Sequence, residues 1–594
     1  MNFRWSLIFL AAGLCAQTPT ESQFIASVNA AIANLNTSTG QGTHPIVISG
    51  NLIFANGKNN YTQASIPILF NYVDGLKAAG CQRIDINPGV TTVTNPTTQP
   101  VLDAVVTHIH ELGLQLSINP EITPGELGQR PAFATFQTTA LQTYAEMASR
   151  YQPDNFVILH EPTTAAASLG LTSSNVQQWH NFITAAAPLI KAASPHTRLG
   201  AGAFQNGVLP DLSTQENAFF QDAATITALD FLTMDIYNVD TFPVYQQWIA
   251  LAHSSGKGIY IEETGEPKYL PVPLPSTLLN ANGFLTESLD SISVIGAADA
   301  DFAPLDASWL EAMANWASAN DMEALTTFET EPFFALGTAG HDTETDTVYV
   351  SSVSAALTKG QLSSTGQAYH AIAAQYGIKT TSSVNNASYA TLTGTYGANG
   401  NNTVAPDSLV SAFGTDLAGA TIELVDSTNA SYSITLLFAS AGQVNYLVPS
   451  AVQNGAAWLT ITSGDGTVSQ GVVLIAPVAP GIYAAADVVT QHADGTQTVT
   501  QASQPINVNG AGDIVYLELF GTGLRHASSL AAVTVQVGNQ SLAPTYVGPQ
   551  GQYPGLDQVN VQLPSSLSGS GTVKVTVKTQ DTGAVSNAVT IDIE

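Results

Sequence analysis

Basic residues are scarce in this chain, and their scarcity excludes several classes of partner. The 594 residues include 15 Lys and Arg against 45 Asp and Glu, which gives a formal net charge of -30. Such a surface repels phosphate backbones and anionic lipid, so we expect no nucleic-acid partner and no binding to membrane surfaces. Charged residues make up only 10% of the chain. Neutral polar side chains must therefore form most of the solvated surface.

Cysteine and long apolar runs are also nearly absent. The chain has two cysteines, and Cys15 lies in a short apolar stretch near the N-terminus. If that stretch is removed, only Cys81 remains, and disulfides cannot stabilise the fold. Cys81 begins an apolar run, so we interpret it as a small core residue. No later run is long and apolar enough to span a bilayer, so we expect no membrane span in the mature chain.

The first sixteen residues have the features of a secretory signal peptide. Arg4 supplies a positive charge, an apolar run covers 5–14, and Ala16 is a small residue before a polar segment. A membrane anchor needs about 18 apolar residues, more than this run contains. Cleavage of a lipoprotein before Cys15 is less favoured, because Leu14 stands where a small residue is wanted. We predict that residues 1–16 are removed and that the protein is secreted or held at the cell surface.

Residues 17–380 show apolar strands that alternate with longer helical patterns. Eight such strands in one segment predict a (β/α)8 barrel of the TIM type, within an α/β fold class. An open, doubly wound sheet is the alternative. No glycine-rich phosphate-binding motif follows the first strand, which disfavours a nucleotide-binding sheet. The predicted strands are 46–49, 83–87, 114–119, 156–161, 198–202, 231–235, 259–263 and 324–328.

The composition changes after residue 380. A linker rich in Thr, Ser, Asn and Gly is predicted for 381–404, and short alternating strands follow it. Two motifs recur in the same order: 409–417 resembles 516–524, and 443–449 resembles 558–564. A repeat of this kind predicts two copies of one β unit, at 405–480 and 481–594. Both copies resemble the immunoglobulin-like sandwiches of plexins and transcription factors, and the tail is similar to a C-terminal module of large secreted bacterial proteins.

Polar residues close most of the predicted barrel strands, and two endings carry glutamates. The fourth strand ends in His160-Glu161-Pro162, and the seventh ends in Glu263-Thr264-Gly265 after an apolar run. Chemistry in a barrel takes place at the end where the strands finish. Glu161 and Glu263 are therefore the candidate catalytic residues.

On these motifs the N-terminal segment resembles glycoside hydrolase clan A, the retaining β-glycosidases built on this barrel. The resemblance implies that Glu161 is the general acid/base and that Glu263 is the nucleophile. By the same resemblance Tyr237 would donate a hydrogen bond to the nucleophile, and Arg83 would lie beneath its carboxylate. His160 stands where the clan has Asn beside the sugar 2-hydroxyl, and Phe328 stands where the clan has Trp at the floor of the sugar site.

The pairing of two glutamates also has a reason in chemistry. Retaining hydrolysis needs a protonated carboxyl that donates to the leaving oxygen and a carboxylate that attacks the anomeric carbon, roughly 5–5.5 Å apart. Glu262 is the rival nucleophile, because neighbouring residues of a strand point to opposite faces. Alternatively, each glutamate is a rim acid held in an ion pair, and Phe328 is a core residue.

The sequence therefore predicts a secreted retaining glycosidase that acts on a β-linked polysaccharide or oligosaccharide. No cofactor and no metal are implied, since the histidines lack metal-ligand spacing. The C-terminal domains are expected to act as a spacer or to anchor the protein to a cell surface or a polysaccharide, and most of their aromatic residues are expected to pack inside. The alternative function is a non-catalytic carbohydrate-binding or adhesion protein with a decayed barrel, which the departure at His160 favours.

Overall fold

The computed structural model of the chain contains two compact units. One unit ends at Ile378, and the other extends from Lys379 to Glu594. The predicted signal peptide at 1–16 and most of the predicted linker at 381–404 lie outside the described residues. The structure describes residues 21–52, 62–122, 132–171, 174–205, 210–237, 242–265, 299–338, 347–380, 382–385, 403–415, 417–464, 466 and 468–594.

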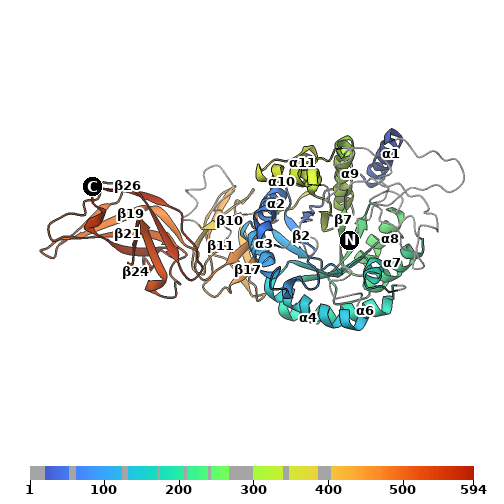
Figure 1. The fold of residues 1–594 in the computed structure, drawn as a ribbon, viewed down its shortest axis with the longest axis horizontal. Helices are drawn as coiled ribbons and strands as arrows, with labels where there is room; N and C mark the ends of the chain where they lie inside the picture. Colours follow the sequence, from blue (N-terminus) through green and yellow to red (C-terminus); the bar gives the residue numbers. More distant parts are fainter. Residues whose placement is uncertain are drawn as a thin grey trace. The chain divides into compact units, whose positions relative to one another are not determined.

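The first unit contains a closed barrel of eight parallel strands, which confirms the predicted fold class (Figure 1). The strands pair in sequence order, and β1 closes the barrel by pairing with β8. All eight are short and almost entirely buried, as strands covered by helices on the outside must be. Their bounds are β1 (Val47–Asn51), β2 (Arg83–Ile86), β3 (Gln115–Ile118), β4 (Asn155–Leu159), β5 (Arg198–Phe204), β6 (Phe231–Ile236), β7 (Gly258–Thr264) and β8 (Ala324–Thr327).

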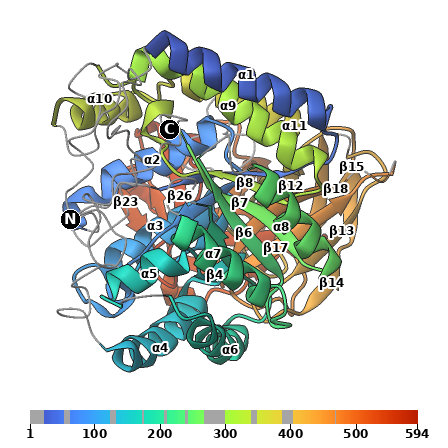
Figure 2. The same ribbon diagram turned by 90° about the vertical axis from the view of Figure 1, so that its right-hand side faces the viewer.

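Helices cover the outside of the barrel and bury their apolar faces against the strands. Figure 2 shows α1, α9 and α11 side by side along one flank, where α9 packs against both of the others. The α-helices are α1 (Glu21–Thr39), α2 (Ile66–Ala78), α3 (Gln99–Glu111), α4 (Phe133–Tyr151), α5 (Pro162–Ser168), α6 (Val176–Ala193), α7 (Pro210–Ala223), α8 (Phe242–Ser254), α9 (Asp299–Ala319), α10 (Thr347–Thr358) and α11 (Ser364–Tyr376). Cys81 is fully buried among them, as the sequence predicts.

Aromatic rings fill the floor of the barrel. Phe231 stacks on Tyr260 with ring centroids 4.1 Å apart, and both belong to a buried cluster contributed by several strands. Two glycines of β5 make room for β6: a Cβ on Gly200 would lie 2.1 Å from the Phe231 ring, and one on Gly202 would lie 1.7 Å from Thr233 Oγ1. The packed floor leaves only the opposite end of the barrel for polar side chains that must meet a substrate.

The second unit consists of β-sheets with two separate apolar cores. The first core lies between the sheet β10-β12-β16-β15 and the sheet β11-β18-β17-β13-β14, to which β9 is added. The second lies between β20-β19-β21-β25-β24 and β23-β22-β26-β27. The first set is β9 (Lys379–Thr380), β10 (Ser382–Asn385), β11 (Thr403–Val404), β12 (Leu409–Phe413), β13 (Thr421–Val425), β14 (Ser431–Ser433), β15 (Leu436–Ala439), β16 (Gln443–Leu447), β17 (Gly455–Thr462) and β18 (Val468–Ile475). The second set is β19 (Gly481–Gln491), β20 (Gln497–Gln501), β21 (Ile514–Thr522), β22 (Val533–Val537), β23 (Gln540–Leu542), β24 (Pro544–Pro549), β25 (Asp557–Leu563), β26 (Gly571–Thr579) and β27 (Val589–Ile593).

The repeated sequence motifs occupy equivalent places in the two β parts. In the first part β12 pairs with β16, and Phe413 lies opposite Gln443. In the second part β21 pairs with β25, and Phe520 lies opposite Gln558. Each of these residues holds the same position within its motif. The internal repeat is thus a repeat of structure, with the same strands paired in the same register.

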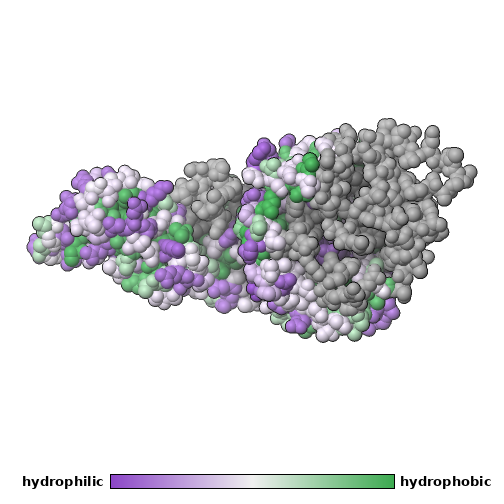
Figure 3. Space-filling view, in the orientation of Figure 1, coloured by the Kyte–Doolittle hydropathy of each residue, from purple (hydrophilic) through white to green (hydrophobic). Residues whose placement is uncertain are grey.

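The surface of the β parts mixes polar residues with scattered apolar ones. Figure 3 shows hydrophilic and hydrophobic residues interspersed over the face of this unit that it displays. Tyr553 is 65% exposed, whereas Tyr446 is fully buried. None of the described helices has the length and apolarity that crossing a membrane requires.

Candidate active site

The end of β4 places two polar residues at the C-terminal end of the barrel. The strand finishes at Leu159, so His160 and Glu161 lie just beyond it, and Pro162 begins α5. Glu161 adopts φ 43° and ψ 64°, a left-handed conformation that is uncommon for a residue with a side chain. Such strain is kept where the surrounding structure enforces it, often at functional sites. The turn from strand to helix therefore occurs at the candidate acid/base itself.

A bulge in β7 brings two neighbouring glutamates into the barrel. Regular alternation would send Glu262 and Glu263 to opposite faces. Against β6, however, Ile261 pairs with Met234 while Glu263 pairs with Asp235, so β7 has one extra residue there. The register against β8 shifts in the same interval. A bulge re-aims side chains in this way next to many active sites.

Three carboxyl groups meet above the barrel floor. Glu161, Asp235 and Glu263 each offer a carboxylate oxygen, and these three oxygens lie within 4.8 Å of one another. All three residues are buried, with exposed fractions of 9%, 1% and 7%. An oxygen of Glu161 therefore lies within 4.8 Å of an oxygen of Glu263, closer than the roughly 6.5–9.5 Å that separates the carboxyl groups of inverting glycosidases.

The same three oxygens form the one group of described residues with the spacing of a metal site. Carboxylate oxygens suit hard divalent cations such as Ca²⁺, Mg²⁺ and Mn²⁺. An ion held there would engage the lone pairs that the candidate nucleophile needs for attack. The cluster can thus hold either a cation or a reacting sugar.

Histidine and tyrosine are the donors closest to the candidate nucleophile. The Tyr237 hydroxyl donates to Glu263 Oε2 at 3.1 Å, the hydrogen bond expected from the resemblance of the sequence motifs. His160 Nδ1 lies 3.7 Å from Glu263 Oε1 and 3.5 Å from Asp235 Oδ2. In the described part of the chain, no Lys or Arg forms an ion pair with Glu161 or Glu263. Among the described residues, an ion pair of Glu263 as a rim acid would therefore have to involve His160.

Burial dominates the electrostatics of the cluster. It raises the pKa of Glu161 above the ordinary value, and the nearby His160 opposes the rise. Burial raises the pKa of Glu263 well above its ordinary value, and Asp235 adds to the rise while His160 and the Tyr237 hydroxyl oppose it. The pKa of Asp235 is raised well above its ordinary value by burial and by the neighbouring glutamates. Burial and mutual repulsion thus both favour the protonated forms of these three carboxyl groups.

Arg83 forms its ion pair with Asp85 rather than with a carboxyl group of the cluster. Its Nε is 3.4 Å from Asp85 Oδ2, and its guanidinium lies 5.1 Å from the centre of the Tyr260 ring. Burial raises the pKa of Glu262 to about 8, with Asp85 adding to the rise and Arg83 opposing it. Within the described residues the ion pair of Arg83 is thus with Asp85, and its field acts on Glu262 rather than on Glu263.

Phe328 follows the last barrel strand and is half-buried. Its backbone N–H donates to the carbonyl of Thr264 at 2.8 Å, which places the Phe328 backbone beside the residue after Glu263. Both interpretations of Phe328 stay predictions: that its ring forms the floor of a sugar site, and that it is a residue of the hydrophobic core.

Two residues of this region were not singled out from the sequence as site members. Asp235 shares a face of β6 with Phe231, which points into the barrel floor, so strand alternation was a usable signal for it. Glu216 lies on α7 and is fully buried. Nothing in the local sequence marks Glu216, because its partners are two backbone N–H groups on other elements.

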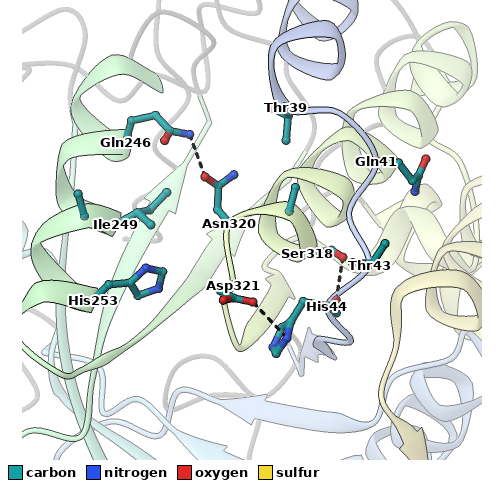
Figure 4. A pocket seen from close by; sticks show the side chains of 12 residues that line it. Thr39, Gln41, Thr43, His44, Gln246, Ile249, His253, Ser318, Asn320 and Asp321 are labelled. Carbon is teal, nitrogen blue, oxygen red and sulfur yellow. Dashed lines mark hydrogen bonds and ion pairs between the residues drawn. The ribbon is translucent and has the colours of Figure 1, made fainter.

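A polar cavity lies at the other end of the barrel and has no part in this cluster. It has a volume of about 510 Å³, and Figure 4 shows it between α8, the end of α9 and the segment before β1. His44 and Asp321 form an ion pair there at 3.3 Å. Its lining residues precede strands, whereas the carboxyl cluster follows them. In a barrel this end serves stability rather than chemistry.

No protein-family model matches the chain, and no curated protein matches it. Solved structures with some similarity include a GH10 endoxylanase retrieved from sugarcane soil metagenome, at 12% identity over 50% of this chain and 88% of that chain, with a TM-score of 0.33. Another is xylanase XynB from Paenibacillus barcinonensis, at 10% identity over 59% and 98%, with a TM-score of 0.35. A third is a GH10 xylanase of Thermobacillus composti, at 12% identity over 55% of this chain and 99% of that chain, with a TM-score of 0.31. At these identities and TM-scores the similarity carries no argument, and the site must be judged on its own geometry.

Proposed function

We propose that the barrel is a retaining glycoside hydrolase that acts on a β-linked polysaccharide or oligosaccharide. One observation carries the proposal: buried carboxyl groups at the ends of β4 and β7 have oxygens within 4.8 Å of each other. A short separation of this kind is typical of retaining enzymes, because inverting enzymes hold a water between the sugar and the second carboxyl group. The net charge of -30 agrees with a neutral substrate rather than an anionic one.

In the proposed reaction, Glu263 attacks the anomeric carbon while Glu161 gives its proton to the leaving oxygen. A covalent glycosyl ester forms on Glu263, and the aglycone departs as an alcohol. Glu161, now a carboxylate, then takes a proton from water, which attacks the anomeric carbon and releases Glu263. Since burial shifts both pKa values in one direction, we assign the roles from position. Glu263 accepts the Tyr237 hydrogen bond, which favours a carboxylate there.

His160 is proposed to contact both the nucleophile and the sugar. Its Nδ1 already faces Glu263 and Asp235, and its side chain keeps 18% of its surface exposed. A ring N–H of His160 directed at Glu263 would stabilise the carboxylate of Glu263 before attack. Phe328 is proposed to pack against a sugar face, less strongly than the larger indole of Trp would.

The experiment is a panel of plant and microbial β-glycans and aryl β-glycosides, with the products sized and their anomeric form followed by NMR. We expect hydrolysis of at least one β-linked substrate, with the β-anomer as the first product. An α-anomer as the first product would exclude the retaining reaction. Tight glycan binding without any turnover would favour the non-catalytic alternative.

We propose that the protein is secreted or held at the cell surface, and that the C-terminal unit is a pair of immunoglobulin-like modules that anchors it. Each β part buries its own apolar core. A part with its own core can fold without the barrel. The exposed Tyr553 is a candidate contact residue for a polysaccharide.

Truncation at about residue 385 should separate chemistry from anchoring. The barrel closes on itself, and all of the proposed catalytic groups precede Thr264. We expect an unchanged rate on a small soluble glycoside and weaker retention on insoluble polysaccharide. A thermal unfolding transition is the control for the integrity of the truncated barrel. If the folded barrel loses its rate on the soluble glycoside, the tail takes part in the active site.

A further inference from the structure

Glu216 is a buried carboxyl group that the proposed reaction does not use. It lies on α7 with an exposed fraction of 0%. Its Oε1 accepts from the backbone N–H of Thr163 at 2.8 Å, and its Oε2 accepts from the N–H of Phe204 at 3.4 Å. Burying a carboxyl group costs free energy, so a buried Glu at this position needs a structural or functional explanation.

The partner of Glu216 lies two residues after the candidate acid/base. Thr163 is in the first turn of α5, and Glu161 is the N-cap residue of that helix. An N-cap side chain usually accepts a hydrogen bond from an N–H of this first turn. The Glu161 side chain makes no such bond. Its carboxylate instead joins Asp235 and Glu263.

The cap that Glu161 does not provide comes from Glu216. If the Glu161 carboxyl group capped its own helix, it would be directed at the helix backbone and could not donate a proton to a substrate. Because an outside acceptor satisfies the Thr163 N–H, the backbone can hold Glu161 in its left-handed conformation with the carboxyl group turned to the site. The second hydrogen bond, from the Phe204 N–H at the end of β5, holds the Glu216 carboxyl group against the barrel.

We infer that Glu216 is a positioning residue that holds the acid/base Glu161 in its catalytic orientation by capping α5 in its place. The expected effect on catalysis rests on the proposed function, whereas the expected effect on the conformation of Glu161 does not. Burial raises the pKa of Glu216 to about 8, with Thr163 opposing the rise. This shift favours the uncharged acid. Gln keeps the shape of Glu and one acceptor oxygen, so it can accept from the Thr163 N–H but loses the longer hydrogen bond from the Phe204 N–H.

The kinetic test compares leaving groups. Glu216→Ala should lower kcat/KM by about 10- to 100-fold on a glycoside with a poor leaving group, since small displacements of a catalytic group have effects of that size. On a dinitrophenyl glycoside, which needs no protonation, we expect a loss of less than about 3-fold. Glu216→Gln should recover most of the loss. Asn175→Ala, which removes the cap of α6 at the Gln178 N–H, is the matched control and should spare both substrates.

A double variant separates positioning from general destabilisation. In a Glu161→Ala background, the further change Glu216→Ala should cost less than about 2-fold on the poor substrate, because the two residues act in one step. Equal losses on both substrates, or additive losses in the double variant, would overturn the inference. If Glu216→Ala does not fold, Glu216→Asp serves instead, since the shorter side chain cannot reach Thr163 as closely.

Crystal structures of the Glu216→Gln and Glu216→Ala or Glu216→Asp variants test the structural claim without any substrate. We expect Glu161 to keep its positive φ with Gln and to lose it with Ala or Asp. An unchanged Glu161 in all three variants would refute the positioning role, whatever the activity. If instead the panel shows no glycosidase activity while Glu161 moves as expected, the proposed function fails and the positioning stands.

Discussion

Glu263→Ala should lower glycoside turnover by about 10⁵-fold or more, for substrates with good and poor leaving groups alike. The proposed reaction passes through an ester on this side chain, and without it no covalent step occurs. Removal of a nucleophile from a covalent mechanism costs on the order of 10⁶-fold in kcat in a well-studied protease. The measurement is kcat on a dinitrophenyl β-glycoside, with protein free of parent enzyme.

Glu262→Gln is the matched control, because it alters the neighbouring buried carboxyl group. Glu262 lies in the field of Asp85, Arg83 and His160. Its charge also acts on Asp235, but its carboxyl group is not one of the three whose oxygens lie within 4.8 Å of one another. We expect a loss of about 10-fold or less from Glu262→Gln, and a loss as severe as that of the Ala variant from Glu263→Gln. The opposite ranking would make Glu262 the nucleophile.

Glu161→Ala should have the second-largest effect, and one that depends on the substrate. General acid catalysis contributes about 10²- to 10⁴-fold, so natural glycans and poor leaving groups should lose that much. A dinitrophenyl glycoside should still form the covalent intermediate, which then accumulates because its hydrolysis lacks the general base. Azide should attack this intermediate, restore turnover and give a β-glycosyl azide. Hydrolysis of natural glycans at the parent rate would remove Glu161 from the mechanism.

The pH profile of kcat/KM provides a check on the same residue. Glu161 must be protonated in the first step, and burial raises its pKa, so the acid form persists to higher pH than for an exposed Glu. The rate on poor leaving groups should therefore fall as the pH rises through this shifted pKa. In Glu161→Gln that alkaline limb should be absent, and the acidic limb that reports ionisation of the nucleophile should remain.

The barrel was accessible to sequence analysis because its signal is local and repeated. Each strand is a short buried run, and helical patterns separate the runs. The tail was accessible for a related reason: the motifs with Phe413 and Phe520 recur, and the strands that carry them pair in one register. Glu161 and Glu263 could be named from strand endings alone, since a barrel collects these at one end.

The details that orient the site depend on contacts between distant elements, and no local pattern shows them. The bulge of β7 arises from its register against both neighbours, which decides where Glu263 points. Arg83 was expected beneath Glu263, but its ion pair is with Asp85, two positions along the same strand face. Glu216 reaches Glu161 only through the fold, 55 residues along the chain. Such groups become visible only when the elements are assembled.

The most direct test of the account is to trap the proposed covalent intermediate and locate it. A 2-deoxy-2-fluoro β-glycoside with a dinitrophenyl leaving group forms the ester faster than water can cleave it, because the fluorine destabilises both transition states and the leaving group favours the first step. Intact mass spectrometry followed by peptide mapping should find one glycosyl group per chain, on Glu263, and none in Glu263→Ala. The account would be contradicted by a glycosyl label on Glu262 or on Glu161. It would also be contradicted if the protein hydrolysed the parent glycoside but carried no label.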